Sequence, residues 1–126
     1  MARILLVEDN REFRSMLRNL LRAAGHEVTE AENGRVAIAC LRSASHDLLV
    51  TDVLLPEADG TEVIKVAAAL HEDIPIIAMS GGGRELPAVV ALALTEAMGA
   101  HRALFKPFRD TELLAAVDDL LPDKRL

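Results

Sequence analysis

The sequence predicts a doubly wound α/β domain, in which a parallel sheet of five strands is covered by helices on both faces. Five short apolar runs alternate with five longer helical patterns along the chain. Several of the runs are apolar at successive positions, which is typical of strands buried on both faces. The length of 126 residues suits one domain covering residues 1–126, and no repeat or linker interrupts it.

The strands are predicted from apolar runs that stop at polar residues. The first run, Ile4 to Val7, stops at Glu8, and the third, Leu48 to Thr51, stops at Asp52. The second run is weaker and precedes the turn signal Asn33-Gly34. The expected strands cover residues 4–7, 27–31, 48–51, 74–79 and 102–105.

The helices are predicted from apolar stripes and from their start and stop signals. Gly25 follows the first stripe, where a helix end is expected, and Pro122 follows the last one. Asp59 and Glu62 have the spacing of a capping box, and Pro87 suits the first turn of a helix. The expected helices cover residues 13–24, 35–43, about 60–70, 87–98 and 113–121.

Composition argues against a direct nucleic-acid partner. The formal net charge is −6 and aromatic residues make up only 2% of the chain, so neither a basic surface nor base stacking is favoured. Arginines do recur at helical spacing in the first helix, and we interpret them as its solvated outer face. These arginines are Arg11, Arg14, Arg18 and Arg22.

Cysteine usage and hydropathy favour a cytoplasmic protein without a membrane span. Cys40 is the single cysteine, so no intrachain disulfide can form, and its apolar neighbours suggest a buried filler. No apolar run approaches the ~20 residues of a membrane helix. The chain runs from Met1 directly into a strand pattern, which does not resemble a cleavable signal peptide.

Polar residues that could take part in catalysis or metal binding follow four of the five strands. Glu8 and Asp9 follow the first strand, Asp52 the third, Ser80 the fourth and Lys106 the fifth. Each could serve only as a cap or turn residue. Together they are expected at one edge, because ligands bind at the carboxyl ends of strands in open α/β sheets.

These motifs resemble the receiver domains of bacterial two-component response regulators. The resemblance covers the chain from about residue 3 to residue 121. The family implies a flavodoxin-like fold with strand order 2-1-3-4-5. The resemblance to this family rests on the following motifs: Val7-Glu8-Asp9-Asn10, Asp52 with Leu55-Pro56 and Asp59-Gly60, Ser80, and Lys106-Pro107-Phe108.

The resemblance implies that Asp52 accepts a phosphoryl group from a phosphohistidine on a sensor histidine kinase or a histidine phosphotransfer protein. A carboxylate can act as such a nucleophile. Lys106 would pair with the phosphoryl group, Ser80 would donate a hydrogen bond to it, and the Lys106-Pro107 bond would be cis. The chain would then catalyse only its own phosphorylation and dephosphorylation.

The family also implies a Mg²⁺ ion at the acidic residues. Asp9 and Asp52 would bind it directly, Glu8 through water, and Leu54 through its backbone carbonyl, a set of oxygen ligands that suits Mg²⁺.

In the family, the helix at residues 87–98, the last strand and the last helix form the output face, which would bind a downstream protein or a second copy. Phosphorylation is expected to reorder residues 81–98.

Two features depart from the family pattern, and two other functions stay open. Ala103 stands where the family has an aromatic switch residue, and Gly81, Gly82 and Gly83 make an unusually glycine-rich loop. A degenerate receiver that acts only as a binding scaffold is one alternative. An aspartyl-phosphate phosphatase is less favoured, since its motif needs an aspartate at Leu54.

Overall fold

The computed structural model describes residues 2–53, 60–71, 73–81, 93, 96–97 and 99–121. Its five strands form one parallel sheet in the order β2-β1-β3-β4-β5. This confirms the fold class and strand order expected from the sequence. The strands are β1 (Arg3–Val7), β2 (Glu27–Ala31), β3 (Leu48–Asp52), β4 (Ile76–Ser80) and β5 (Arg102–Phe105).

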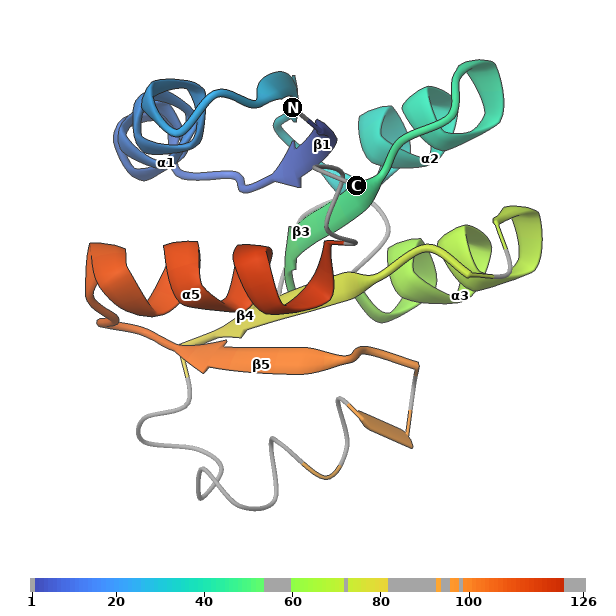
Figure 1. The fold of residues 1–126 in the computed structure, drawn as a ribbon. Coiled ribbons are helices and arrows are strands. Elements are labelled where there is room, and N and C mark those ends of the chain that lie inside the picture. The colour runs from blue at the N-terminus through green and yellow to red at the C-terminus, as the bar shows by residue number, and fades with distance from the viewer. Residues whose placement is uncertain are drawn as a thin grey trace, which may run out of the picture.

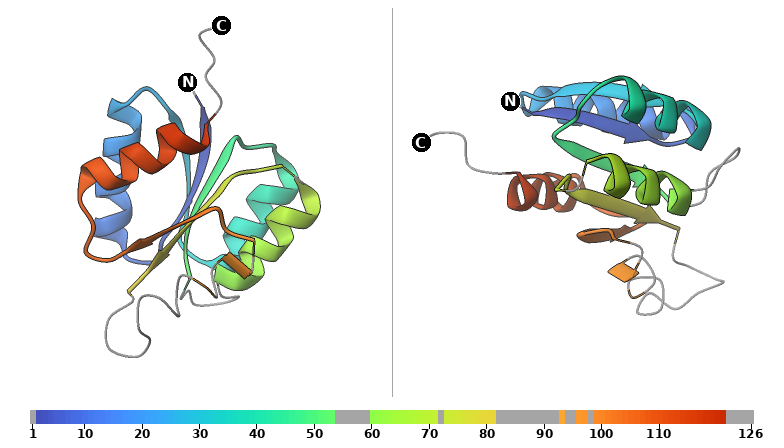
Figure 2. Two further views of the ribbon diagram at one scale, coloured as in Figure 1. Left: turned by 60° about the horizontal axis from the view of Figure 1, so that its bottom comes forward. Right: turned by 90° about the vertical axis from the view of Figure 1, so that its right-hand side faces the viewer.

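Helices cover both faces of the sheet. The structure describes α1 (Arg11–Ala23), α2 (Gly34–Ser43), α3 (Gly60–Leu70) and α5 (Asp110–Leu120). Helices α1 and α5 lie on one face, and α2 and α3 lie on the other (Figures 1 and 2). The predicted helix at residues 87–98 falls mostly outside the described residues, of which residues 93, 96 and 97 are helical.

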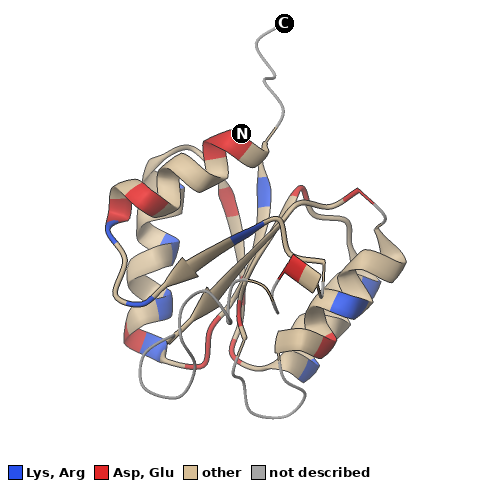
Figure 3. Ribbon diagram, turned by 90° about the horizontal axis from the view of Figure 1, so that it is seen from below, with Lys and Arg blue, Asp and Glu red and all other residues tan. Residues whose placement is uncertain are grey.

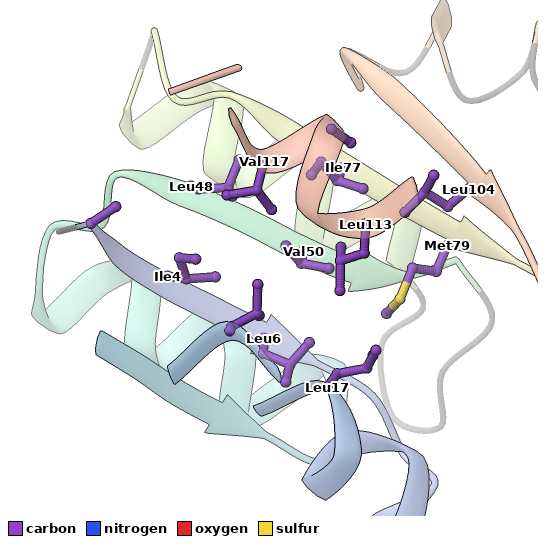
Figure 4. Close-up of a cluster of buried hydrophobic side chains, with 13 residues drawn as sticks. Ile4, Leu6, Leu17, Leu48, Val50, Ile77, Met79, Leu104, Leu113 and Val117 are labelled. Atoms are coloured by element: carbon purple, nitrogen blue, oxygen red, sulfur yellow. The ribbon is translucent and has the colours of Figure 1, made fainter. Parts of the chain in front are cut away.

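Successive side chains of a strand point to opposite faces of the sheet and belong to two separate hydrophobic clusters. In β1, Ile4 and Leu6 join the cluster under α1 and α5, which Figure 4 shows in close-up. Leu5 and Val7 join the cluster under α2 and α3. All four of these side chains are fully buried, so the apolar run is explained by burial on both faces.

Local signals explain the starts of two helices. The Asn10 side chain accepts a hydrogen bond from the backbone N–H of Phe13 at 2.9 Å and caps α1. Asn33 accepts one from Val36 at 2.9 Å and caps α2. The Asn33-Gly34 pair is therefore the start of a helix as well as a turn, and α2 begins one residue earlier than predicted.

The fourth strand is shorter than predicted, starting at Ile76 instead of residue 74. The N–H of Ile74 donates to the carbonyl of His71 at 3.0 Å, which closes the turn after α3. Pro75 has no N–H to donate to the sheet, although its carbonyl accepts from Leu49 at 3.0 Å. Regular pairing can therefore begin only after the proline.

Candidate functional site

The carboxyl ends of four adjacent strands bring the predicted polar residues together. Glu8 follows β1, Asp52 ends β3, Ser80 ends β4 and Lys106 follows β5. The backbone N–H of Lys106 donates to the carbonyl of Ser80 at 2.8 Å, which holds these two strand ends side by side. The peptide bond between Lys106 and Pro107 is cis.

Lys106 forms two short ion pairs at the centre of the site. Its Nζ atom lies 2.7 Å from Oε1 of Glu8 and 2.7 Å from Oδ2 of Asp52. The side chains of Glu8 and Asp52 are 1% and 8% exposed, whereas that of Lys106 is 26% exposed. Two buried carboxylates thus share one lysine that still reaches solvent.

The acidic residues have the composition and spacing of a site for a hard cation. Glu8, Asp9 and Asp52 each offer one carboxylate oxygen, and these oxygens lie within 4.8 Å of one another. Oxygen donors of this kind, with an exposed aspartate open to water, fit Mg²⁺. Leu54, the source of the expected backbone ligand, lies outside the described residues.

Burial and hydrogen bonding perturb the charges of the site in opposite ways. Burial raises the pKa of Glu8, and the hydrogen bonds from Lys106 and Asn10 only partly offset this. Burial lowers the pKa of Lys106, but its hydrogen bonds to Asp52 and Glu8 outweigh burial and the pKa is raised overall. Lys106 is therefore held protonated as the cationic member of the site.

A close contact at Gly60 fixes the backbone of Asp52. The N–H of Gly60 donates to the carbonyl of Val53 at 2.9 Å. A Cβ atom at Gly60 would clash with the backbone oxygen of Asp52 and would lie 2.6 Å from Cα of Val53. Only glycine fits this position, a role that the Asp59-Gly60 motif marks in the sequence without giving its contact. Asp59, the expected cap, lies outside the described residues.

Two phenylalanines pack against each other beside Lys106. The rings of Phe13 in α1 and Phe108 after β5 meet edge to face, with centroids 5.8 Å apart. The Lys106 ammonium lies 5.0 Å from the centroid of Phe13, a cation–π geometry. The sequence showed Phe13 only as part of the apolar stripe of α1, so its contact with the lysine was not predicted.

The arginines of α1, which Figure 3 shows as blue bands along the helix, are not simply a solvated face. Arg14 and Arg18 each pair with Glu30 of β2 at 3.1 Å. Their side chains are only 13% and 27% exposed. The prediction of a solvated face is wrong for these two residues, because Glu30 on the neighbouring strand supplies an anion within reach.

Other expected features lie at the margins of the site. Ala103, in the position of the family's aromatic residue, pairs in the sheet with Ala78. Gly82 and Gly83 lie outside the described residues. Cys40 is partly buried against the cluster under α2 and α3. Within the described ranges, no helix has the length and hydropathy needed to cross a membrane.

Comparisons with known proteins agree with this arrangement. The chain is 39% identical over 121 residues to the transcriptional regulatory protein CpxR of Escherichia coli K12, covering 96% of this chain and 50% of CpxR. It is 33% identical to the response regulator receiver protein CpdR of Brucella abortus, covering 96% of this chain and 98% of CpdR. The chain thus spans about half the length of CpxR and nearly all of CpdR.

The fold also matches solved structures of the same kind. The response regulator TrrA of Thermotoga maritima, determined in complex with Mg²⁺ and BeF, superposes with a TM-score of 0.83 at 30% identity. The match covers 96% of this chain and all of TrrA. The model of the response regulator receiver domain matches residues 4–118. This chain therefore belongs to the response regulator receiver domain family of two-component signalling systems, as the sequence motifs indicated.

Proposed function

We propose that Asp52 is the phosphoacceptor of this receiver domain. Receiver domains of response regulators are phosphorylated by histidine kinases. The observation that carries the assignment is the position of Asp52. Its carboxylate ends a central strand, contacts Lys106 at 2.7 Å and lies beside the carboxylates of Glu8 and Asp9.

The acidic cluster would hold Mg²⁺. Asp9 and Asp52 would bind the ion directly and Glu8 through water, with the Leu54 carbonyl as a further ligand. The cation would offset the repulsion among three carboxylates and the charge of the incoming phosphoryl oxygens.

In the proposed transfer step, each of these groups has one role. A carboxylate oxygen of Asp52 attacks phosphorus, an acyl phosphate O–P bond forms, and the P–N bond of the phosphohistidine breaks. The imidazole leaves with the electron pair of that bond. Lys106 then pairs with the transferred phosphoryl oxygens, and the Ser80 hydroxyl donates a hydrogen bond to one of them.

Partners and output form the remaining part of the proposal. The donor would be a sensor histidine kinase or a histidine phosphotransfer protein in the cytoplasm, and residues 1–126 would act as one receiver domain. The output face would be formed by the helix at residues 87–98 with β5 and α5, and would bind a downstream protein or a second copy. Most of that helix lies outside the described residues.

Two alternatives make different predictions. A scaffold that is never phosphorylated would gain no mass from a phosphodonor. A phosphatase would release phosphate from phosphomonoesters over many turnovers, whereas a receiver domain only hydrolyses its own acyl phosphate. The ion pair between Lys106 and Asp52 favours the phosphoacceptor over the scaffold, because it holds a cation against the carboxylate that would react.

Intact-mass spectrometry after incubation with acetyl phosphate tests the proposal. With Mg²⁺ we expect the mass of one added phosphoryl group, and with excess chelator we expect almost none. Asp52→Asn should abolish the gain, while Asp47→Asn, which changes an aspartate before β3 at the other end of the strand, should retain it. Full phosphorylation of Asp52→Asn, or full rate in chelator, would refute the assignment.

A further inference from the structure

Arg14 connects three elements around the acidic turn after β1. Its Nη1 atom donates to the backbone carbonyl of Glu8 at 2.8 Å. Its Nε atom donates to Oε1 of Glu30, in β2, at 3.1 Å. One guanidinium therefore joins α1, the end of β1 and β2 through two different nitrogens.

The backbone of Glu8 is held on both of its sides. Its N–H donates to the carbonyl of Ala31 in β2 at 3.1 Å, and its carbonyl accepts from Arg14. The peptide unit that carries this carbonyl leads directly to Asp9. Beyond it, the N–H of Asn10 donates to the Glu8 carboxylate at 3.0 Å. The turn that presents two of the three acidic residues is thus fixed by hydrogen bonds. Among the described residues, Lys106 donates to the Glu8 carboxylate, whereas the Arg14 side chain donates to the backbone of the turn.

Glu30 holds Arg14 in place and is itself held by a second arginine. Arg18 donates from Nη1 to Oε2 of Glu30 at 3.1 Å, so the carboxylate receives one hydrogen bond on each oxygen. Burial raises the pKa of Glu30, but the hydrogen bonds from Arg18 and Arg14 outweigh burial and lower it overall. An ionised Glu30 in a fixed position leaves the guanidinium of Arg14 little freedom to turn away from Glu8.

We infer that Arg14 is a positioning residue for the metal site, which aims Glu8 and Asp9 through the backbone and is itself oriented by Glu30. The inference rests on the proposed Mg²⁺-dependent function. Groups that orient ligands from outside the ligand set can affect metal affinity by about 10–100-fold. Arg14 acts on the main chain and not on a ligand atom, so the lower end of this range, about tenfold, is expected.

Titration calorimetry with MgCl₂ on the full chain, paired with urea unfolding, separates positioning from plain stabilisation. Arg14→Gln should weaken Mg²⁺ binding about tenfold. Arg22→Gln is the matched control, because Arg22 lies on the same helix and donates to a carbonyl of β2, that of Val28, at 3.4 Å. It should leave Mg²⁺ affinity unchanged even if it lowers stability.

Two further variants keep the inference testable if Arg14→Gln does not fold. Arg14→Lys keeps the charge but has a single nitrogen, which cannot bond Glu30 and Glu8 with the geometry of the guanidinium fork, so affinity should still fall. Glu30→Gln leaves Arg14 intact but frees its orientation, and should weaken binding by a smaller factor.

The outcomes distinguish this inference from the function on which it rests. If the wild-type chain binds Mg²⁺ and the Arg14 variants bind it equally well, Arg14 only stabilises the fold and the inference is wrong. If Arg22→Gln weakens binding as much as Arg14→Gln does, the effect is general loss of stability and the inference is again wrong. If the wild-type chain binds no Mg²⁺, the proposed metal site itself fails.

Discussion

Replacing Lys106 with methionine should expose the electrostatic conflict that this lysine resolves. Glu8 and Asp52 are almost completely buried and both contact Lys106 at 2.7 Å. Methionine keeps most of the side-chain volume and removes the charge. Without the ammonium, two buried carboxylates face each other, with the exposed carboxylate of Asp9 close by. In the absence of a metal ion, the folded state should lose stability.

The size of the loss can be bounded from the geometry. Two unit charges 2.7 Å apart attract by about 6 kcal/mol at an effective dielectric constant of ~20. Most of that attraction is offset by the cost of removing the charges from water. Removing one partner of a buried pair usually costs about 3–5 kcal/mol. Because Lys106 is 26% exposed, we expect the lower end, about 3 kcal/mol.

Urea unfolding followed by far-ultraviolet circular dichroism provides the assay, since the chain has no Trp or Tyr for fluorescence. Added Mg²⁺ should restore part of the lost stability, because the cation replaces the ammonium among the carboxylates. Its stabilising effect should therefore be larger in Lys106→Met than in the wild type. Lys65→Met, on the exposed side of α3, is the matched control. It should change neither the unfolding free energy without Mg²⁺ nor the stabilisation by Mg²⁺ appreciably. Equal stability of Lys106→Met and the wild type without Mg²⁺, or an equal response to Mg²⁺, would contradict the reasoning.

Two other substitutions probe the backbone around Asp52 and the opposite edge of the sheet. Gly60→Ala should cost about 1–3 kcal/mol of unfolding free energy, since the new Cβ meets the backbone of Asp52. It should also slow phosphorylation by acetyl phosphate. Gly81→Ala, whose Cβ would meet nothing within 4 Å, should lose little stability, and comparable losses in the two variants would argue against the contact. At the other edge, Nδ1 of His26 accepts a hydrogen bond from a backbone N–H at 3.2 Å, and burial lowers the pKa of this histidine. Below about pH 6.5 the unfolded chain therefore binds a proton that the folded chain resists, so stability should fall as the pH decreases below this value. His26→Asn keeps an acceptor that does not titrate and should flatten this slope in urea unfolding, whereas an unchanged slope would show that His26 does not cause it.

The sequence predicted the strand ends, and with them most of the site, for a clear physical reason. A buried strand is apolar along its whole length, so the first polar residue marks where it leaves the core. Parallel strands then bring these ends to one edge. Glu8, Asp52, Ser80 and Lys106 could therefore be placed together before any contact was known.

What the sequence could not give was the choice of partners between elements. The pairing of Arg14 with Glu30 depends on where α1 lies relative to β2, and spacing within the helix alone suggested a solvated face. The contact between Phe13 and Lys106 likewise joins residues 93 positions apart by number, which no local pattern encodes. The start of β4 was misplaced for a different reason, because the apolar run includes Pro75, which cannot donate to the sheet.

The identity of the phosphoacceptor is tested most directly by locating the modified residue chemically. Borohydride reduces an acyl phosphate to an alcohol, so a phosphorylated aspartate becomes homoserine, which peptide mass spectrometry can place in the sequence. After treatment with acetyl phosphate and Mg²⁺, we expect homoserine at Asp52 and at no other aspartate. Homoserine at Asp9 or elsewhere with Asp52 unchanged, or stable phosphate on Ser80, would rule out Asp52 as the phosphoacceptor.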